Sequence, residues 1–165
     1  MGDADRLRYQ ESVVVAAAPE VLFDLVTDIG RTGEWSPICT GCWWDDPAEA
    51  GRVGAWFTGR NELPHRTWET RSKVVVADRP NEFAFLVGDG FVRWGYTFEP
   101  ARDATLVTES WHFLPAGIEM FHQKYGERAA TEIEARTQAA HTGIPETLAS
   151  IKRIAEESGQ RSPSR

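Results

Sequence analysis

Polar and apolar residues alternate over several long stretches in the middle of the chain. The clearest stretch covers residues 92–98, where Val92, Trp94, Tyr96 and Phe98 share one face of an extended backbone. A period of two is typical of a β-strand with one buried face and one wet face. Together with turn residues and β-branched residues, this pattern predicts strands over 6–16, 41–46, 53–62, 67–78, 81–88, 91–99 and 104–114.

Other parts of the chain have apolar residues at helical spacing. Residues 19–29 carry such a stripe behind a proline that suits a first helical turn, and a second short helix is expected over 31–36. Residues 118–141 and 144–157 are also predicted to be helical. Pro145 and the glycine before it indicate a break or a kink, so one bent helix and two helices both remain open.

This order of elements predicts an α+β fold with seven antiparallel strands, because consecutive strands joined by short loops pair in antiparallel fashion. A sheet of this length curls. The last helix is the only element long and apolar enough to cover the concave face, and a cavity is expected between this helix and the sheet. The apolar stripe that would cover the sheet consists of Ile144, Leu148, Ile151 and Ile154.

Size and composition fit one globular domain. The chain has 165 residues, of which 41% are hydrophobic and 26% charged. We predict a single domain over residues 6–157, with flexible termini at 1–5 and 158–165.

The charge balance argues against nucleic-acid binding. There are 18 Lys and Arg residues against 25 Asp and Glu residues, a net charge of −7, and cations do not cluster beyond pairs before the C-terminal tail. No apolar run approaches the roughly 20 residues that span a bilayer, and the polar N-terminus does not resemble a signal peptide. We therefore expect a soluble cytoplasmic protein, monomeric or homodimeric, that binds no nucleic acid and has no integral membrane segment.

The two cysteines, Cys39 and Cys42, have the C-x-x-C spacing of a redox pair or of half a zinc site. There is no second such pair, and the four histidines show no ligand spacing. The residues around the thiols look like a turn that leads into a strand, not the helix start typical of a redox pair. The sequence therefore predicts no metal, no cofactor and no catalytic thiol.

One carboxylate is predicted to lie inside the domain. In the last strand, Val107, Glu109 and Trp111 share the apolar face. A buried carboxylate needs a partner or loses its charge, so Glu109 is either a structural residue paired with Arg, Trp or Tyr donors, or a ligand contact or general base. Arg60 is one possible partner, although Gly59 indicates a bulge that would turn it away.

The sequence also resembles a known family over roughly residues 8–157. The matching segments are 33–37, 40–43, 54–61, 108–111 and 147–152, which are similar to actinobacterial polyketide cyclase/dehydrase-type proteins. These belong to the START and birch-pollen-allergen-like (SRPBCC) superfamily. The resemblance implies a helix-grip fold, in which a curved seven-stranded sheet wraps around the long C-terminal helix and two short helices follow the first strand. Members bind lipids, sterols or polyketides, or catalyse cyclisation.

From these observations we expect a binding protein for a small hydrophobic molecule such as a lipid, a polyketide or an aromatic metabolite. The alternatives are a cyclase or dehydratase with Glu109 as acid or base, and a protein-interaction module whose cavity is filled by side chains. No Ser-His-Asp order or G-x-S-x-G motif is present. The predicted ligand-binding residues are Trp35, Phe57, Asn61, Trp68, Thr70, Phe85, Trp94, Tyr96, Glu109, Trp111 and Leu148.

Overall fold

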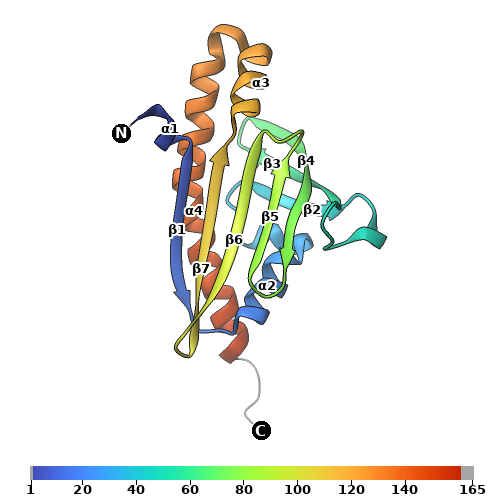
Figure 1. The fold of residues 1–165 in the computed structure, drawn as a ribbon, viewed down its shortest axis with the longest axis vertical. Coiled ribbons are helices and arrows are strands. Elements are labelled where there is room, and N and C mark those ends of the chain that lie inside the picture. Colours follow the sequence, from blue (N-terminus) through green and yellow to red (C-terminus); the bar gives the residue numbers. More distant parts are fainter. Residues whose placement is uncertain (1, 161–165) are drawn as a thin grey trace.

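The computed structural model describes residues 2–160 (Figure 1) and contains a curved, seven-stranded antiparallel sheet. The strand order is β1-β7-β6-β5-β4-β3-β2, so β1 and β2 form the two edges. Each predicted strand is present, within a few residues of its predicted ends. The strands are β1 (Arg8–Val15), β2 (Cys39–Trp44), β3 (Trp56–Leu63), β4 (Arg66–Asp78), β5 (Glu82–Val87), β6 (Val92–Ala101) and β7 (Ala104–Phe113).

Strand β7 shows why the sequence pattern predicts these faces well. Every second residue is buried, and the residues between are half-buried. The inward face predicted for this strand is confirmed, with a carboxylate among its apolar residues. The buried side chains are Thr105, Val107, Glu109, Trp111 and Phe113.

Helices lie before β1, after β7 and in the connections from β1 to β2 and from β2 to β3. The two short helices predicted after β1 are present as α2 and the 3-10 helix η1, whereas the short helix α1 at the N-terminus was not predicted. Residues 161–165 of the predicted flexible tail lie outside the described residues. The helical elements are α1 (Asp3–Arg6), α2 (Pro19–Thr27), η1 (Ile29–Glu34), η2 (Pro47–Glu49), α3 (Pro115–Tyr125), η3 (Gly126–Arg128) and α4 (Ala129–Gln160).

The C-terminal helical region divides at Gly126, which was not predicted, and of the alternatives left open around Pro145 the structure shows one continuous helix. Gly126 has φ of 55°, a left-handed conformation that glycine adopts without steric cost, and it ends α3. Pro145 lies inside α4. A proline inside a helix costs roughly 3 kcal/mol, and the helix residues Ile144 and Leu148 on either side of it are buried.

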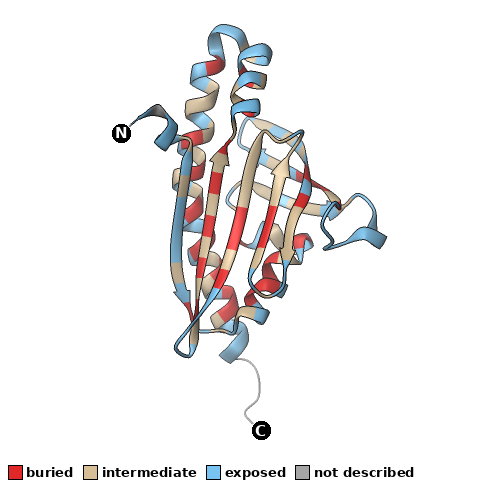
Figure 2. Cartoon of the chain, in the orientation of Figure 1, coloured by how far each residue is buried: buried red, intermediate tan, exposed pale blue. Residues whose placement is uncertain are grey.

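Helix α4 is the cover of the concave face. It has 32 residues and runs behind the sheet along β1 and β7 in Figure 1. Figure 2 shows buried residues repeating along the side of the helix that faces the sheet. The predicted stripe is buried as expected, and it continues toward the N-terminus of the helix. The buried residues of α4 are Ala129, Thr137, Ala140, Ile144, Thr147, Leu148, Ile151, Ile154 and Ala155.

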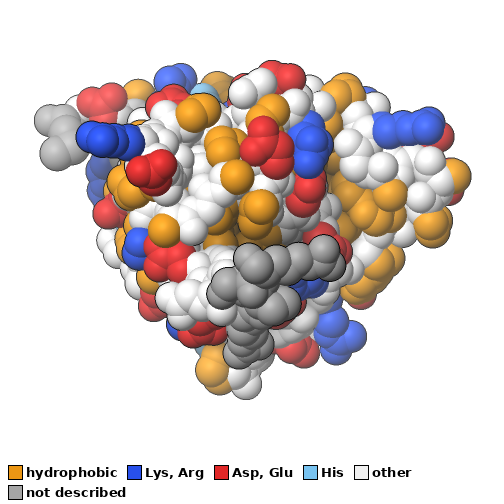
Figure 3. Space-filling view, turned by 90° about the horizontal axis from the view of Figure 1, so that it is seen from below, with side chains coloured by type: hydrophobic (Ala, Val, Ile, Leu, Met, Phe, Trp, Pro, Cys, Tyr) orange, Lys and Arg blue, Asp and Glu red, His pale blue; other side chains and the backbone are white. Residues whose placement is uncertain are grey.

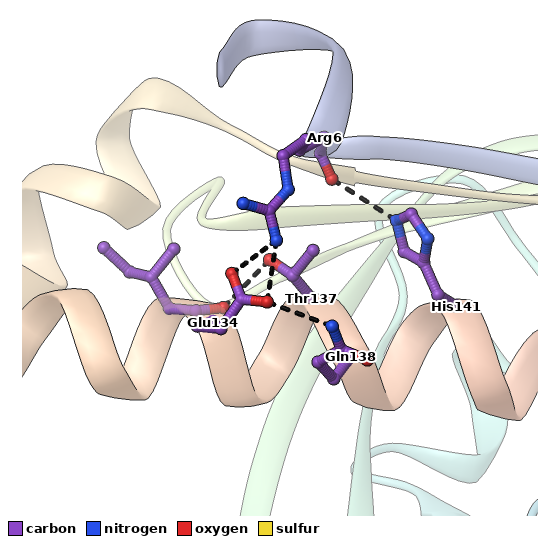
Figure 4. A network of polar contacts seen from close by, with 6 residues as sticks. Arg6, Glu134, Thr137, Gln138 and His141 are labelled. Atoms are coloured by element: carbon purple, nitrogen blue, oxygen red, sulfur yellow. Dashed lines mark hydrogen bonds and ion pairs between the residues drawn. The ribbon is translucent and has the colours of Figure 1, made fainter. Parts of the chain in front are cut away.

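Polar contacts hold α4 against the N-terminal part of the chain (Figure 4). The Arg6 guanidinium lies 2.7 Å from the Glu134 carboxylate, and the His141 ring lies 3.4 Å from the Arg6 carbonyl oxygen. Farther along α4, Lys152 donates to the Val14 carbonyl at 2.7 Å. These contacts are exposed and each contributes little to the free energy of unfolding. They join α4 to the N-terminal segment and to β1.

The surface carries mixed charge. At the end of the molecule where α4 finishes, Figure 3 shows basic, acidic and hydrophobic side chains interspersed. Within residues 2–160, no helix is long and apolar enough to cross a membrane. Exposed large hydrophobic residues are distributed over several elements and comprise Val14, Val21, Trp43, Val53 and Leu63.

The packing of α4 can be tested at Leu148, whose side chain is only 2% exposed. We expect Leu148→Ala to lower the free energy of unfolding by about 2–5 kcal/mol, because it removes a buried side chain and leaves a cavity. Glu146→Ala, at an exposed position of the same helix, should change it by less than about 0.5 kcal/mol. Urea unfolding of both variants and the wild type measures these changes in the free energy of unfolding. Equal losses in the two variants would contradict the burial of Leu148 beneath α4.

Candidate ligand-binding cavity

A cavity of about 520 Å³ lies between the sheet and the helices. Strands β2 to β7 form one wall, and η1, α3 and α4 supply residues to the others. A cavity of this volume lies within the usual range for small-molecule sites. The aromatic residues that alternate along the strands thus face an open space in addition to the packed core.

The predicted ligand-binding residues converge on this cavity, with one exception. Leu148 is buried on α4 but does not line the cavity, because it packs into the core farther along the helix. The structure therefore does not place this predicted ligand contact at the cavity. The predicted residues that line the cavity are Trp35, Phe57, Asn61, Trp68, Thr70, Phe85, Trp94, Tyr96, Glu109 and Trp111.

Glu109 is the central polar group of the cavity wall. It lies opposite Tyr96 in the pairing of β6 with β7, and the Tyr96 hydroxyl donates a hydrogen bond to Glu109 Oε1 at 2.8 Å. Its other oxygen, Oε2, is buried and finds no hydrogen-bond partner among residues 2–160. An unpartnered buried polar atom is costly, so Oε2 marks a point where a ligand group or a water molecule would be stabilised.

Burial changes the protonation of Glu109. The carboxyl side chain is only 3% exposed, and its burial raises its pKa from 4.5 to about 8, whereas the hydrogen bond from Tyr96 opposes this rise. Burial likewise raises the pKa of the Tyr96 hydroxyl, and the neighbouring Glu109 adds to that effect. Near neutral pH, Glu109 is therefore mainly protonated and Oε2 can carry a hydrogen-bond donor.

The other predicted polar residues have local roles. Asn61 donates weakly from its side-chain amide to the Gly59 carbonyl at 3.5 Å and to the Thr70 hydroxyl at 3.4 Å. Arg60 is not the partner of Glu109, because it is exposed on the opposite face, 3.5 Å from the Glu62 carboxylate.

The histidines lie outside the cavity wall. His112 accepts a hydrogen bond from Arg8 on the outer side of β7, and burial lowers its pKa. His141 stacks on Tyr9 with the ring centres 4.3 Å apart, and neither His141 nor His122 lines the cavity. Glu109 thus has no histidine partner inside the cavity.

Sequence reasoning missed a group of cations beside the aromatic wall. Four cations line the cavity, compared with two acidic residues. The cations are Arg66, Arg71, Lys124 and Arg136, and the acidic residues are Glu69 and Glu109. Two of these cations lie over one indole: the Arg66 guanidinium is 4.3 Å and that of Arg136 6.0 Å from the centre of the Trp68 ring. These residues come from β4, α3 and α4, so only the packing of helices on the sheet brings them together.

The two cysteines also line the cavity. Both are free and half-buried, and their sulfur atoms lie 3.3 Å apart. Cys39 is the first residue of β2, close to the predicted turn into a strand. In the part of the chain that the structure describes, no group of three or more His, Cys, Asp or Glu side chains is placed to hold a metal ion.

Comparison with known families agrees with this architecture. Residues 6–141 match the sequence model of the family described as polyketide cyclase/dehydrase and lipid transport. The chain belongs to this family. The resemblance inferred from the sequence is thereby confirmed, and with it the helix-grip type of fold. No curated protein matches the chain.

Solved structures of similar proteins place this polyketide cyclase/dehydrase family member among its relatives. A polyketide-cyclase-like protein from Corynebacterium glutamicum is 49% identical, with 96% of this chain and 98% of that one covered and a TM-score of 0.70. The di-domain ARO/CYC protein of the steffimycin biosynthetic pathway is 14% identical; the match covers 93% of this chain and 52% of that one, with a TM-score of 0.68. A Mycobacterium smegmatis protein is 19% identical, with 99% and 97% coverage and a TM-score of 0.62. The last two show the fold alone.

The protonation of Glu109 gives a testable pH dependence. Its pKa in the folded protein, about 8, is above the ordinary value of 4.5, so between these values the folded state holds more protons than the unfolded state. Its contribution to stability is therefore fully present below 4.5 and is lost as the pH rises toward 8. Between about pH 5 and about pH 9, the wild type should lose on the order of 2–4 kcal/mol more stability than Glu109→Gln.

Urea unfolding of both proteins at the two pH values measures this difference. Glu99→Gln, at an exposed position on the neighbouring strand β6, is the matched control and should follow the wild type. If Glu109→Gln follows it as well, Glu109 is ionised in the folded protein near neutral pH, contrary to the assignment.

Proposed function

We propose that this family member binds a small, mainly hydrophobic molecule in the cavity between the sheet and α4. The observation that carries the proposal is the unpartnered Glu109 Oε2 on the wall of a cavity of about 520 Å³. The surrounding aromatic wall favours an apolar ligand body, at roughly 25 cal/mol per Å² of apolar surface buried. The molecule is of the lipid, polyketide or aromatic-metabolite class.

Glu109 sets the polar requirement of the ligand. Tyr96 already donates to Oε1, and a protonated Oε2 donates in turn to an acceptor. The ligand therefore carries a carbonyl, ether or hydroxyl oxygen that reaches the wall between β6 and β7. This hydrogen bond orients the ligand, while the aromatic side chains supply most of the binding free energy.

The cations beside the cavity suggest a second polar end. Arg136 and Lys124 come from the helices, and Arg66 and Arg71 from β4. Arg66 and Arg136 also lie over the Trp68 ring, where their charge is attracted to the face of an aromatic group. Arg71 already pairs with Asp45 at 2.7 Å and Arg136 with Glu132 at 3.2 Å, whereas within residues 2–160 no ion pair forms at Arg66 or Lys124. An acidic group at the exposed end of the ligand would lie beside these cations.

An enzymatic role is the second candidate, and the protonation of Glu109 favours it. A carboxyl group with a pKa of about 8 can donate a proton to a substrate oxygen near neutral pH, as a general acid does. A cyclase or dehydratase of this kind would use the cavity to fold its substrate. The interaction-module alternative needs a cavity filled by side chains, and the open volume argues against it.

Ligand binding can be tested with an aromatic ketone and the matched hydrocarbon that lacks its oxygen. Four cavity tryptophans, Trp35, Trp68, Trp94 and Trp111, should report binding by a change in fluorescence. Near pH 7, Glu109→Leu should lower the affinity for the ketone by about two- to tenfold, because a hydrogen bond contributes roughly 0.5–1.5 kcal/mol. The affinity for the hydrocarbon should not fall.

Glu109→Gln separates the donor role from the shape of the site. Its amide can donate at any pH, so its affinity for the ketone should stay constant. The affinity of the wild type should fall as the pH rises through about 8 and the carboxyl group loses its proton. Binding without any dependence on residue 109 would contradict this polar contact, and the absence of binding across a panel of fatty acids, sterols and flavonoids would contradict the function itself.

The acidic end of the ligand has its own test. A fatty acid and the fatty alcohol of the same chain length are titrated against the wild type and Arg136→Gln. We expect the variant to lose affinity for the acid by a few-fold, with the alcohol unaffected, because only the acid can pair with the guanidinium. Arg153→Gln, an exposed arginine outside the cavity on the same helix, is the control. Equal losses for acid and alcohol would point to packing and not to charge.

A further inference from the structure

A bulge in β2 brings two thiols to the same face. Residues three apart on a regular strand point to opposite sides of the sheet. Here Cys39 pairs with Asn61 and Gly41 with Arg60, so one extra residue is inserted in β2 between them. As a result Cys39 and Cys42 both line the cavity, with their sulfur atoms 3.3 Å apart.

The neighbouring strand leaves room for the pair. Cys42 lies opposite Gly59 of β3, and a Cβ atom added at Gly59 would be 3.4 Å from Cys42 Sγ and 3.5 Å from Cys39 Sγ. Glycine inside a strand weakens it and often marks a close approach of another group. At this position, the group that approaches Gly59 is the pair of sulfur atoms.

The two thiols are not equivalent. The hydrogen bond between the two sulfur atoms lowers the pKa of Cys42; burial opposes this effect, and the Thr32 hydroxyl adds to it. The same hydrogen bond, together with burial, raises the pKa of Cys39. Cys42 is therefore the thiol that ionises first and attacks, and Cys39 is the resolving thiol in contact with it.

We propose that Cys39 and Cys42 form a reversible redox site in the cavity wall, which closes to an intramolecular disulfide on reaction with a small-molecule disulfide such as oxidised glutathione. The bulge and the contact between the sulfur atoms support this site. A disulfide has its sulfur atoms about 2.05 Å apart, so the two thiols have only a short distance to move. The proposal does not rest on the proposed function, although both thiols line the same cavity.

The reaction proceeds by two exchanges. The Cys42 thiolate attacks one sulfur of oxidised glutathione, the glutathione S–S bond breaks, and one glutathione leaves and takes up a proton. Cys39 then loses its proton and attacks Cys42 Sγ, which breaks the mixed disulfide and releases the second glutathione. Two electrons pass from the protein thiols to the glutathione disulfide, and the two thiol protons end on the two glutathione molecules. Excess reduced thiol reverses both steps.

The reduced 165-residue chain is incubated with oxidised glutathione, and the remaining free thiols are blocked with N-ethylmaleimide. The mass of the intact protein is then measured by mass spectrometry. We expect the loss of both free thiols, a mass lower by two hydrogen atoms and no retained glutathione. Dithiothreitol should restore both thiols. A stable glutathione adduct on the wild type, or two thiols that remain free with excess oxidant, would overturn the proposal.

Two single variants provide matched controls. Cys39→Ser removes the thiol that releases glutathione, so a stable adduct should accumulate on Cys42. Cys42→Ser removes the thiol assigned to attack first, and its adduct should form several-fold more slowly. An unmodified Cys39→Ser protein whose circular dichroism matches the wild type would overturn the assignment of Cys42 as the attacking thiol.

Discussion

The packing of one long helix over one part of a curved sheet determines the rest of this structure. Helix α4 packs against β1 and β7, where its buried stripe covers the concave face. The aromatic residues of β4 to β6 lie beyond that cover, and many of them remain half-buried beside the cavity. The helix packs closely only on β1 and β7, and the space between the remaining strands and the helices is the candidate site.

The candidate chemistry follows from this incomplete cover. Glu109 continues the inward face of β7, with Val107 on one side and Trp111 on the other. Its position in the wall removes water from the carboxyl group without supplying a charged partner. The protonated, neutral carboxyl group is therefore lower in free energy than the charged carboxylate. The cross-strand hydroxyl of Tyr96 satisfies one oxygen, and the other is left for whatever occupies the cavity. The structural pairing and the proposed ligand contact therefore involve the same side chain.

Irregular positions supply the features that alternation does not predict. The bulge at the start of β2 turns Cys39 and Cys42 to one side, which makes a pair of thiols from residues that a regular strand would separate. Gly126 ends α3 and lets α4 begin, and the two helices then bring Lys124 and Arg136 to the cavity. The bulge and the end of α3 each depend on the backbone conformation at a single position. A hydrophobic pattern does not encode that conformation.

The sequence by itself determined the seven strands, the inward faces of β6 and β7, the burial of Glu109 and the family, because strand alternation is a local property with a fixed period of two. The tertiary structure decided that Tyr96 and not Arg60 faces Glu109, that Leu148 belongs to the core, and that the helical break lies at Gly126. It also decided that Arg66 and Arg136 lie over the Trp68 ring. Each of these depends on the register of strands or on the placement of a helix on the sheet. Both are set by contacts between residues far apart in the chain.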